Sequence, residues 1–305
     1  MSGRSDISVS ENSDPQLSRL AAASAVYGRG KQILGLQIAL TVLGGFVSSI
    51  TAAVLPQSKV WVVFYSFVVA LLDGVVLEKL QLESRKKGAR IQELFDCELF
   101  SIPWRNLVSG DQPTREFLTE EADKYKRKHR DLTSLRNWYS PSVSRLPLPL
   151  GRLICQRTNA WWDAGLRKRY TSLLTTLLWG LCIFAFALAL HRGMTLDKFV
   201  LTVVAPVTPA ALWGVREIRK HSSATLELEH LQGQIDKQWQ SALDGTLAGD
   251  DLVRASISIQ EQLFYFRSKN PFVFNWVYRL LRSRQENTMH QIAEQLVAEA
   301  ERVHS

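Results

Sequence analysis

Long apolar stretches alternate with charged segments along this chain, and four of the stretches are long enough to cross a lipid bilayer. They occupy residues 33–55, 60–80, 173–190 and 196–215. An α-helix rises about 1.5 Å per residue, so roughly 20 apolar residues span the hydrocarbon core. Short links join the runs in pairs. The pattern therefore predicts two hairpins of transmembrane helices. The alternative, buried core helices of a soluble domain, fits two adjacent pairs of this length poorly.

The charged segments also show helical periodicity. After the second run, apolar residues spaced three or four apart form an amphipathic stalk that ends before Pro103. Further helices are predicted at residues 114–136, 151–170, 216–243, 251–267 and 274–305. No convincing alternation of apolar and polar residues predicts a strand. We expect an all-α integral membrane protein with four transmembrane helices in two hairpins and a helical cytoplasmic domain.

The predicted elements divide the chain into five parts. The N-terminal part is rich in Ser and Asp and lacks the apolar core of a signal peptide, which favours a disordered tail. The parts are a disordered cytoplasmic tail at residues 1–30, a first transmembrane hairpin at 31–82, a cytoplasmic helical domain at 83–172, a second transmembrane hairpin at 173–215, and C-terminal cytoplasmic helices at 216–305.

The distribution of charge predicts how the chain is oriented in the membrane. Residues 83–170 contain about 18 Lys and Arg against about 11 Asp and Glu, whereas the hairpin tips carry few charges. Because positive segments tend to stay in the cytoplasm, both termini and the middle segment are predicted to lie there. The net charge of +8 is explained by this rule and by attraction to anionic lipid, so it does not indicate a nucleic acid polymer as partner.

One predicted helix carries a polar stripe that could bind a ligand. Residues spaced four, three, four and four apart fall within about 80° of one helix face. Guanidinium groups bind phosphate through paired hydrogen bonds and aromatic rings stack on bases, so the stripe and the loop before it suit a nucleotide. The alternative is an ordinary Asp163–Arg167 pair on a face that contacts water. The predicted ligand-binding residues are Arg136, Trp138, Tyr139, Arg152, Gln156, Asn159, Asp163 and Arg167.

Motifs of catalysis and of metal or cofactor binding were not found in the sequence. It has no Gly-rich phosphate loop, nucleophile elbow or zinc-type Cys/His spacing. Its three cysteines are scattered, which predicts no disulfide framework. Glu93 and Asp96 lie three residues apart, but such a pair more often takes part in a salt bridge than in acid–base catalysis. We therefore expect no enzyme activity, no catalytic residue, no cofactor and no metal.

Asp73 is the outlier within the second apolar run. An ionised carboxylate inside a span costs a few kcal/mol on insertion scales, so Asp73 is expected to face protein or water. It is predicted to line a pore or to take part in gating. The alternative is a carboxylate hydrated near the cytoplasmic headgroups, with Lys79 about two turns further on.

Several sequence blocks together resemble a known family, the SMODS-associated four-transmembrane effectors. The resemblance extends from Ile33 to the C-terminus and leaves the N-terminal tail outside. The blocks that carry it are Ile91-Gln92-Glu93-Leu94-Phe95-Asp96, Ile102-Pro103-Trp104, Arg136-Asn137-Trp138-Tyr139, Leu153-Ile154-Cys155-Gln156-Arg157-Thr158-Asn159, Trp161-Trp162-Asp163 and Leu166-Arg167-Lys168-Arg169-Tyr170.

The resemblance implies a role in bacterial antiphage defence. Proteins of this family occur beside the nucleotidyltransferases of cyclic-oligonucleotide-based antiphage signalling systems. A member is expected to respond to the cyclic oligonucleotide made by its synthase, to form homo-oligomers, and to permeabilise the inner membrane, which causes abortive infection. Two other functions remain open from the residues alone: a constitutive channel or transporter subunit, and a non-conducting scaffold that recruits a cytoplasmic partner.

Overall fold

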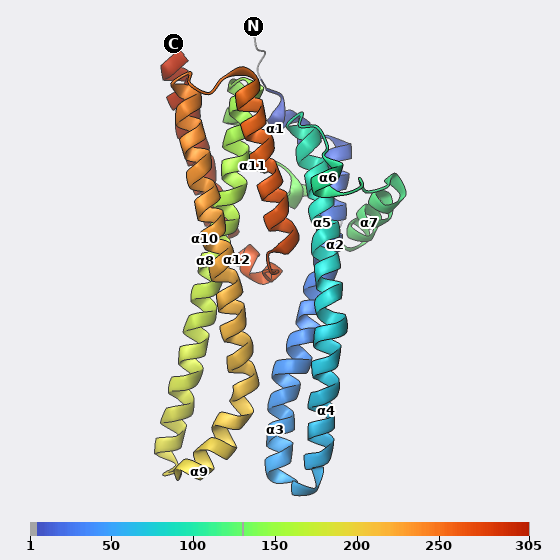
Figure 1. Cartoon of the computed structure of the whole chain (residues 1–305), viewed down its shortest axis with the longest axis vertical. Helices are drawn as coiled ribbons and strands as arrows, with labels where there is room; N and C mark the ends of the chain where they lie inside the picture. Colours follow the sequence, from blue (N-terminus) through green and yellow to red (C-terminus); the bar gives the residue numbers. More distant parts are fainter. Residues whose placement is uncertain (1–4, 130, 305) are drawn as a thin grey trace.

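The computed structural model of the chain describes residues 5–129 and 131–304, and within them it contains helices and no strand. Its shape is an elongated bundle, with two helical hairpin tips at one end and α1 and the C-terminal end of the last helix at the other (Figure 1). This arrangement agrees with the all-α prediction.

Long helical rods form the bundle, and each rod runs from the tip end into the opposite half. The first hairpin consists of α2 (Asp14–Ile38), the π-helical segment η1 (Ala39–Leu43), α3 (Gly44–Val54), the turn η2 (Pro56–Ser58), α4 (Lys59–Leu71), the π-helical segment η3 (Leu72–Leu77) and α5 (Glu78–Leu99). The second consists of α8 (Leu148–His191), α9 (Leu196–Phe199), the π-helical segment η6 (Val200–Val204) and α10 (Ala205–Leu243).

The half that contains the tips is apolar on its outside. Among the described residues, three helices are long and apolar enough to cross a membrane: Asp14–Ser48, Val60–Leu99 and Leu148–His191. At most 11% of the apolar window of each is buried inside the protein, so these side chains face outward. The fourth predicted run forms α9, η6 and the start of α10, and two of its side chains, at residues 202 and 206, lie outside the described ones. A fourth crossing stays a prediction.

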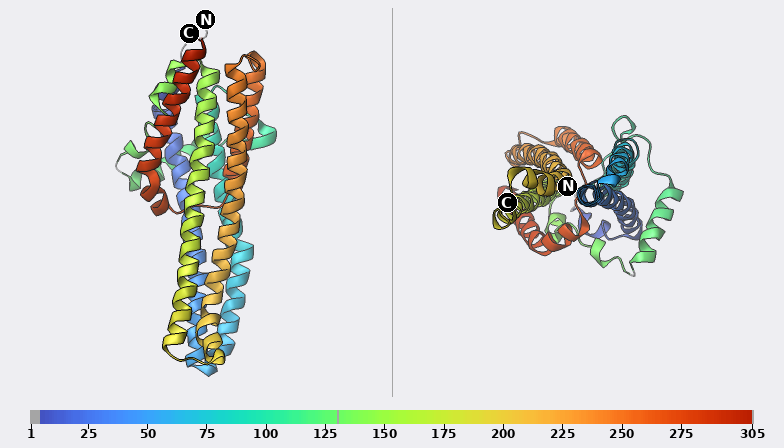
Figure 2. Two further views of the ribbon diagram at one scale, coloured as in Figure 1. Left: turned by 90° about the vertical axis from the view of Figure 1, so that its left-hand side faces the viewer. Right: turned by 90° about the horizontal axis from the view of Figure 1, so that it is seen from below.

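The opposite half contains the main hydrophobic core. The shorter elements there are α1 (Ile7–Ser10), α6 (Asn106–Ser109), α7 (Arg115–Lys128), η4 (Thr133–Leu135), η5 (Pro141–Arg145), α11 (Gly249–Lys269) and α12 (Asn275–His304). The core lies among α5, α8, α10, α11 and α12, and it includes the fully buried side chains of Phe100, Ile235 and Trp239. On the other side, α2 packs against α5 and α7 (Figure 2).

The expected disordered tail at residues 1–30 is wrong for the part that the structure describes. Residues 7–10 form α1, and α2 begins at Asp14. Ile7 is buried in the main core, and the Ser5 hydroxyl donates a hydrogen bond of 3.1 Å to the Val143 carbonyl. The polar composition hid this order because it comes from contacts with residues far along the chain, which local propensity does not register. Residues 1–4 lie outside the described residues.

Two helix boundaries also differ from their predictions. The charged helix expected at residues 114–136 ends at Lys128, and Thr114 caps its start by accepting a hydrogen bond from the Phe117 N–H. The helix expected to begin at residue 151 begins at Leu148, because Pro149 fits the first turn of a helix, where no N–H partner is required. From there α8 continues without a break into the third apolar run.

The crossing of α2 and α5 depends on Gly88. A Cβ atom at this position would lie closer than 3.0 Å to the ring of Tyr27. We expect Gly88→Ala to destabilise the protein by about 1–3 kcal/mol through overpacking, measured as a lower melting temperature of the detergent-solubilised chain by circular dichroism. Gly28→Ala is the matched control, because no atom lies within 4 Å of its added Cβ. An equal loss of stability in both variants would contradict the packing argument.

Candidate functional site

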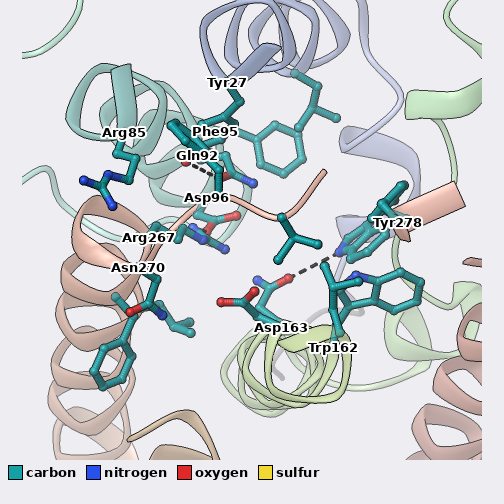
Figure 3. Close-up of a pocket in the computed structure, with 18 of the residues that line it drawn as sticks. Tyr27, Arg85, Gln92, Phe95, Asp96, Trp162, Asp163, Arg267, Asn270 and Tyr278 are labelled. Atoms are coloured by element: carbon teal, nitrogen blue, oxygen red, sulfur yellow. Dashed lines mark hydrogen bonds and ion pairs between the residues drawn. The ribbon is translucent and has the colours of Figure 1, made fainter. Parts of the chain in front are cut away.

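A cavity of about 330 Å³ lies between the two hairpins, in the polar half of the bundle. One wall comes from α2 and α5, and the opposite wall comes from α8 (Figure 3). The end of α11, the connection after it and the start of α12 complete the lining, together with the segment around η4. The cavity is therefore built from both hairpins and from the C-terminal helices.

Six of the eight predicted ligand-binding residues line this cavity. They are Arg136, Trp138, Tyr139, Asn159, Asp163 and Arg167. Three residues of the stripe on α8 and three of the loop before it thus meet at one place. Whether a ligand binds there stays a prediction.

The structure does not bring Arg152 and Gln156 to the cavity. The amide of Gln156 donates hydrogen bonds to the Ser256 carbonyl (2.9 Å) and to Oε1 of Gln260 (3.1 Å), so α11 covers this part of the stripe. Arg152 is also buried, its Nε and Nη1 have no hydrogen-bond partner, and burial lowers its pKa. These two residues belong to the helix packing, which one-dimensional periodicity cannot distinguish from a ligand site.

Aromatic rings form one side of the cavity. The rings of Trp138 and Trp162 meet edge to face at 4.8 Å between centroids, and Tyr278 follows at 5.9 Å from Trp162. The indole N–H of Trp138 donates to Oδ1 of Asn159 (3.3 Å), and the Asn159 amide donates to the hydroxyl of Tyr139 (2.9 Å). These bonds fix the orientation of the aromatic side chains, and flat rings in such a setting can stack on a planar ligand.

Positive charge exceeds negative charge in the lining. Its cationic side chains come from both hairpins and from α11, and they are Lys31, Arg85, Arg136, Arg167 and Arg267. The acidic ones are Asp96 and Asp163. Burial lowers the pKa of Arg85, because the charged form loses water there. Such a surplus of cations, of which all but Arg136 are at least partly buried, favours an anionic ligand.

Arg267 closes the cavity on the side of α5. Its Nη1 donates to Oδ2 of Asp96 at 2.5 Å, and Figure 3 shows the two side chains across the cavity from Asp163. The Gln260 amide bridges Asp96 and Glu93, at 2.9 and 2.8 Å. The interpretation of Glu93 and Asp96 as members of a salt-bridge cluster therefore holds for Asp96. Burial, with Asp96 nearby, raises the pKa of Glu93 to about 7.

A second chain of polar groups leads from the cavity to α10. Arg167 donates through Nε to Asp163 (3.0 Å), through Nη1 to the Pro271 carbonyl (2.9 Å), and through Nη1 to Nδ1 of His221 (3.2 Å). Because arginine can only donate, Nδ1 of His221 accepts and its proton is assigned to Nε2, which lies 3.6 Å from Oε2 of Glu217. Burial lowers the pKa of His221, although the Glu217 carboxylate opposes this shift.

Sequence reasoning missed several residues of the cavity. Arg85, Gln92 and Tyr27 lie on segments that were expected to be a stalk and a tail. Arg267, Asn270 and Tyr278 lie on or between the C-terminal helices, where no ligand contact was predicted. His221, next to the cavity, had no motif around it. The sequence signal that could have indicated these cavity residues was a cation one or two turns beyond an apolar run. The positive-inside rule explains such a cation equally well, without a ligand site.

Asp73 contacts protein rather than Lys79. It lies in η3, where Oδ1 accepts a hydrogen bond of 2.5 Å from the amide of Gln37 on α2. Gln81 in turn donates to Oε1 of Gln37 at 2.8 Å. The carboxylate therefore faces the neighbouring helix of its own hairpin, in agreement with the expectation that it faces protein or water. A role in a pore or gate stays a prediction.

Comparisons with known proteins cover nearly the whole chain. The sequence model of a family described as SMODS-associating 4TM effector domain matches residues 5–296. The chain is 25% identical to a probable CBASS effector molecule of Bacillus cereus (strain VD146) over 292 aligned residues. The alignment covers 92% of this chain and 95% of the relative. No solved structure matches the chain significantly. The family match begins at residue 5 rather than at Ile33, in keeping with the packing of α1 and α2 against the rest of the polar half.

The pKa of Glu93 predicts how stability depends on pH. Its pKa is higher in the folded protein, at about 7, than the ordinary value of 4.5. The stability that this group contributes is therefore fully present below pH 4.5 and is lost as the pH rises to about 7. We expect Glu93→Gln to flatten the fall in melting temperature of the solubilised protein across this window.

The pH-dependent loss in the free energy of unfolding that Glu93→Gln removes is on the order of a few kcal/mol. Glu98→Gln is the control for a change of net charge on the same helix, because Glu98 is exposed and pairs with Arg19. If the wild type and Glu93→Gln show the same pH profile, Glu93 does not titrate in this range.

Proposed function

Since the chain belongs to the SMODS-associating 4TM effector domain family, we propose that it is an antiphage effector of the bacterial inner membrane that senses a cyclic oligonucleotide. Its polar half and both termini lie in the cytoplasm, and all four apolar runs cross the bilayer. The CBASS assignment of the Bacillus cereus relative supports a cyclic-oligonucleotide signal made by a cognate synthase. The effect is abortive infection through a permeabilised membrane, without enzyme chemistry.

The observation that carries this proposal is the cavity between the hairpins. Its cations provide paired donors for phosphate groups, and its aromatic side provides faces for bases. Its volume of about 330 Å³ lies within the range, about 300–1,000 Å³, that small-ligand sites occupy. A cyclic oligonucleotide combines closely spaced phosphates with exposed bases, so both parts of the lining have a partner in one ligand.

The cavity lies between the two hairpins, so a bound ligand can affect how they are arranged. Lys31 and Arg85 belong to the first hairpin, whereas Arg167 belongs to the second. An anion held by both groups favours one relative position of the hairpins. Ligand binding shifts the equilibrium only to the extent that it is tighter in that state.

The route from the cavity to the bilayer is direct. Arg167 lies on α8, which continues into the third span, and through His221 and Glu217 it contacts the first turns of α10 after the fourth. In the apolar half α3 packs against α10, where a Cβ on Gly45 would lie 3.2 Å from Pro209. The π-helical segments η1, η3 and η6 lie within the apolar runs, and such segments often mark functional sites. Rearranged hairpins of several copies then form the leak.

Nucleotide binding is tested by calorimetric titration of the detergent-solubilised chain with a panel of cyclic di- and trinucleotides. We expect one member to bind, and Arg136→Ala to weaken it about 10- to 100-fold, because a charge-assisted hydrogen bond contributes about 1.5–3 kcal/mol. Arg127→Ala is the matched control: Arg127 is equally exposed but lies on α7, outside the cavity. Absence of binding by every member would sink the proposal.

The polar chain to α10 is tested by His221→Leu. This change removes one of the three hydrogen-bond acceptors of Arg167, and the contact to Glu217, at similar side-chain volume. In cells that carry the synthase, we expect dye entry to be lost while nucleotide binding changes less than about threefold, since His221 does not line the cavity. His230→Leu, an exposed histidine on the same helix, is the control. Dye entry at the wild-type level with normal expression would contradict this route.

A synthase-independent leak would instead favour a constitutive channel. An intact membrane together with a stably bound cytoplasmic protein would favour a scaffold.

A further inference from the structure

The start of α12 lies at the level where the helices leave the apolar half. Val273 and Val277 pack in one cluster with Leu166, Tyr170 and the first residues of the third apolar run, Leu173 and Leu174. Lys31, two residues before the first run, donates a hydrogen bond of 2.5 Å to Asn275. Figure 1 shows α12 beginning beside α8, about halfway along the bundle. The first turns of α12 therefore lie at the predicted boundary between lipid and water.

The outer face of these turns is apolar with one cation. Trp276 is 50% exposed and Leu280 is 72% exposed, whereas Val277 on the inner face is 2% exposed. Residues 276, 279 and 280 share one side of the helix because they are three or four positions apart. Arg279 on this side is also exposed. A tryptophan, a leucine and an arginine on one face are typical of helices that lie in the headgroup layer.

Other exposed cations lie within about two helical turns of those ends of the apolar runs that lead into the polar half. They follow the second run, precede the third and follow the fourth, and they are Lys86, Lys87, Lys168, Arg169, Arg216, Arg219 and Lys220. Such a collar of positive charge attracts anionic lipid headgroups, by about 1 kcal/mol for each cation near the surface.

We propose that residues 275–280 are an interfacial anchor that binds the headgroup layer of the bilayer on the side of the polar half. A lipid surface fits better than a second copy of the chain for two reasons. The inner side of these turns packs against the start of the third apolar run, and Leu177 and Trp179 further along that run are exposed. Two large side chains also bury far less than the roughly 1,200 Å² of a stable protein interface.

The anchor connects the bilayer to one wall of the cavity. Residues 270–273 line the cavity, and the anchor begins immediately after this connection. Tyr278 lines the cavity from the inner side of the same turns. A bilayer that holds residues 275–280 therefore also holds one wall of the cavity in place, whatever ligand enters it.

The anchor is tested by spin labelling the full-length chain in vesicles of phosphatidylethanolamine and phosphatidylglycerol. The parent carries Cys182→Ser, since Cys182 is exposed and the other two cysteines are buried. Labels at Trp276→Cys and Leu280→Cys are compared with Trp179→Cys in the third span and Leu226→Cys on α10, both exposed in the structure. Collision with oxygen reports lipid, and collision with a water-soluble nickel chelate reports solvent.

We expect both labels on α12 to collide more with oxygen and at least about threefold less with nickel than the label at Leu226→Cys, approaching the label at Trp179→Cys. Nickel access equal to that of Leu226→Cys would overturn the anchor. Labels that neither reagent reaches would also overturn it, because a protein would then cover the face. The experiment requires no nucleotide, so its outcome is independent of the proposed ligand.

Discussion

The hydrocarbon core of a bilayer offers no hydrogen-bond partner to a peptide group, and this constraint governs the rest of the structure. A spanning segment must satisfy its backbone internally, so the chain crosses as helices. Nothing at the membrane boundary requires these helices to stop, and α2, α5, α8 and α10 continue into the polar half. The walls of the cavity are thus extensions of the rods that carry the apolar surface. A displacement at the cavity does not have to pass through a loop to reach the bilayer.

The polar half buries several charged side chains around the cavity, including Asp96 and Arg167. Taking ions out of water costs several kcal/mol each, and replacing buried pairs by apolar residues is often neutral or stabilising. Yet Arg267, Asp96, Arg167 and His221 form two buried polar chains on opposite sides of one cavity. Neither chain is needed to fill the core, which already contains large apolar side chains of α5, α8, α10 and α11. Such an arrangement suits a site where an incoming anion can exchange for an internal partner.

The sequence predicts those features that depend on local periodicity. The apolar runs and the continuity of α8 into the third run both follow from spacing within one segment. The order of residues 5–30 does not, because α1 packs against η5 and the Ser5 hydroxyl bonds to Val143, 138 residues away. The loss of Arg152 and Gln156 from the site has a similar cause. Whether a polar stripe faces a ligand or another helix depends on where α11 comes to lie, and sequence spacing contains no information on that.

Arg267 is a cavity residue that spacing within its own helix did not identify. On its own helix it is a cation in the last turn, where it would ordinarily complement the helix dipole. Its role arises only because α11 packs along α5 and sets the guanidinium against Asp96. Asp96 is the ion-pair partner of Arg267. A phosphate that bound Arg267 in its place would leave the carboxylates of Glu93 and Asp96 with only the Gln260 amide between them. The negative charge of Asp96 disfavours the ionised form of Glu93, whose pKa burial already raises. An anion bound at Arg267 would therefore favour the protonated form of Glu93 and would weaken the ion pair that joins α5 to α11.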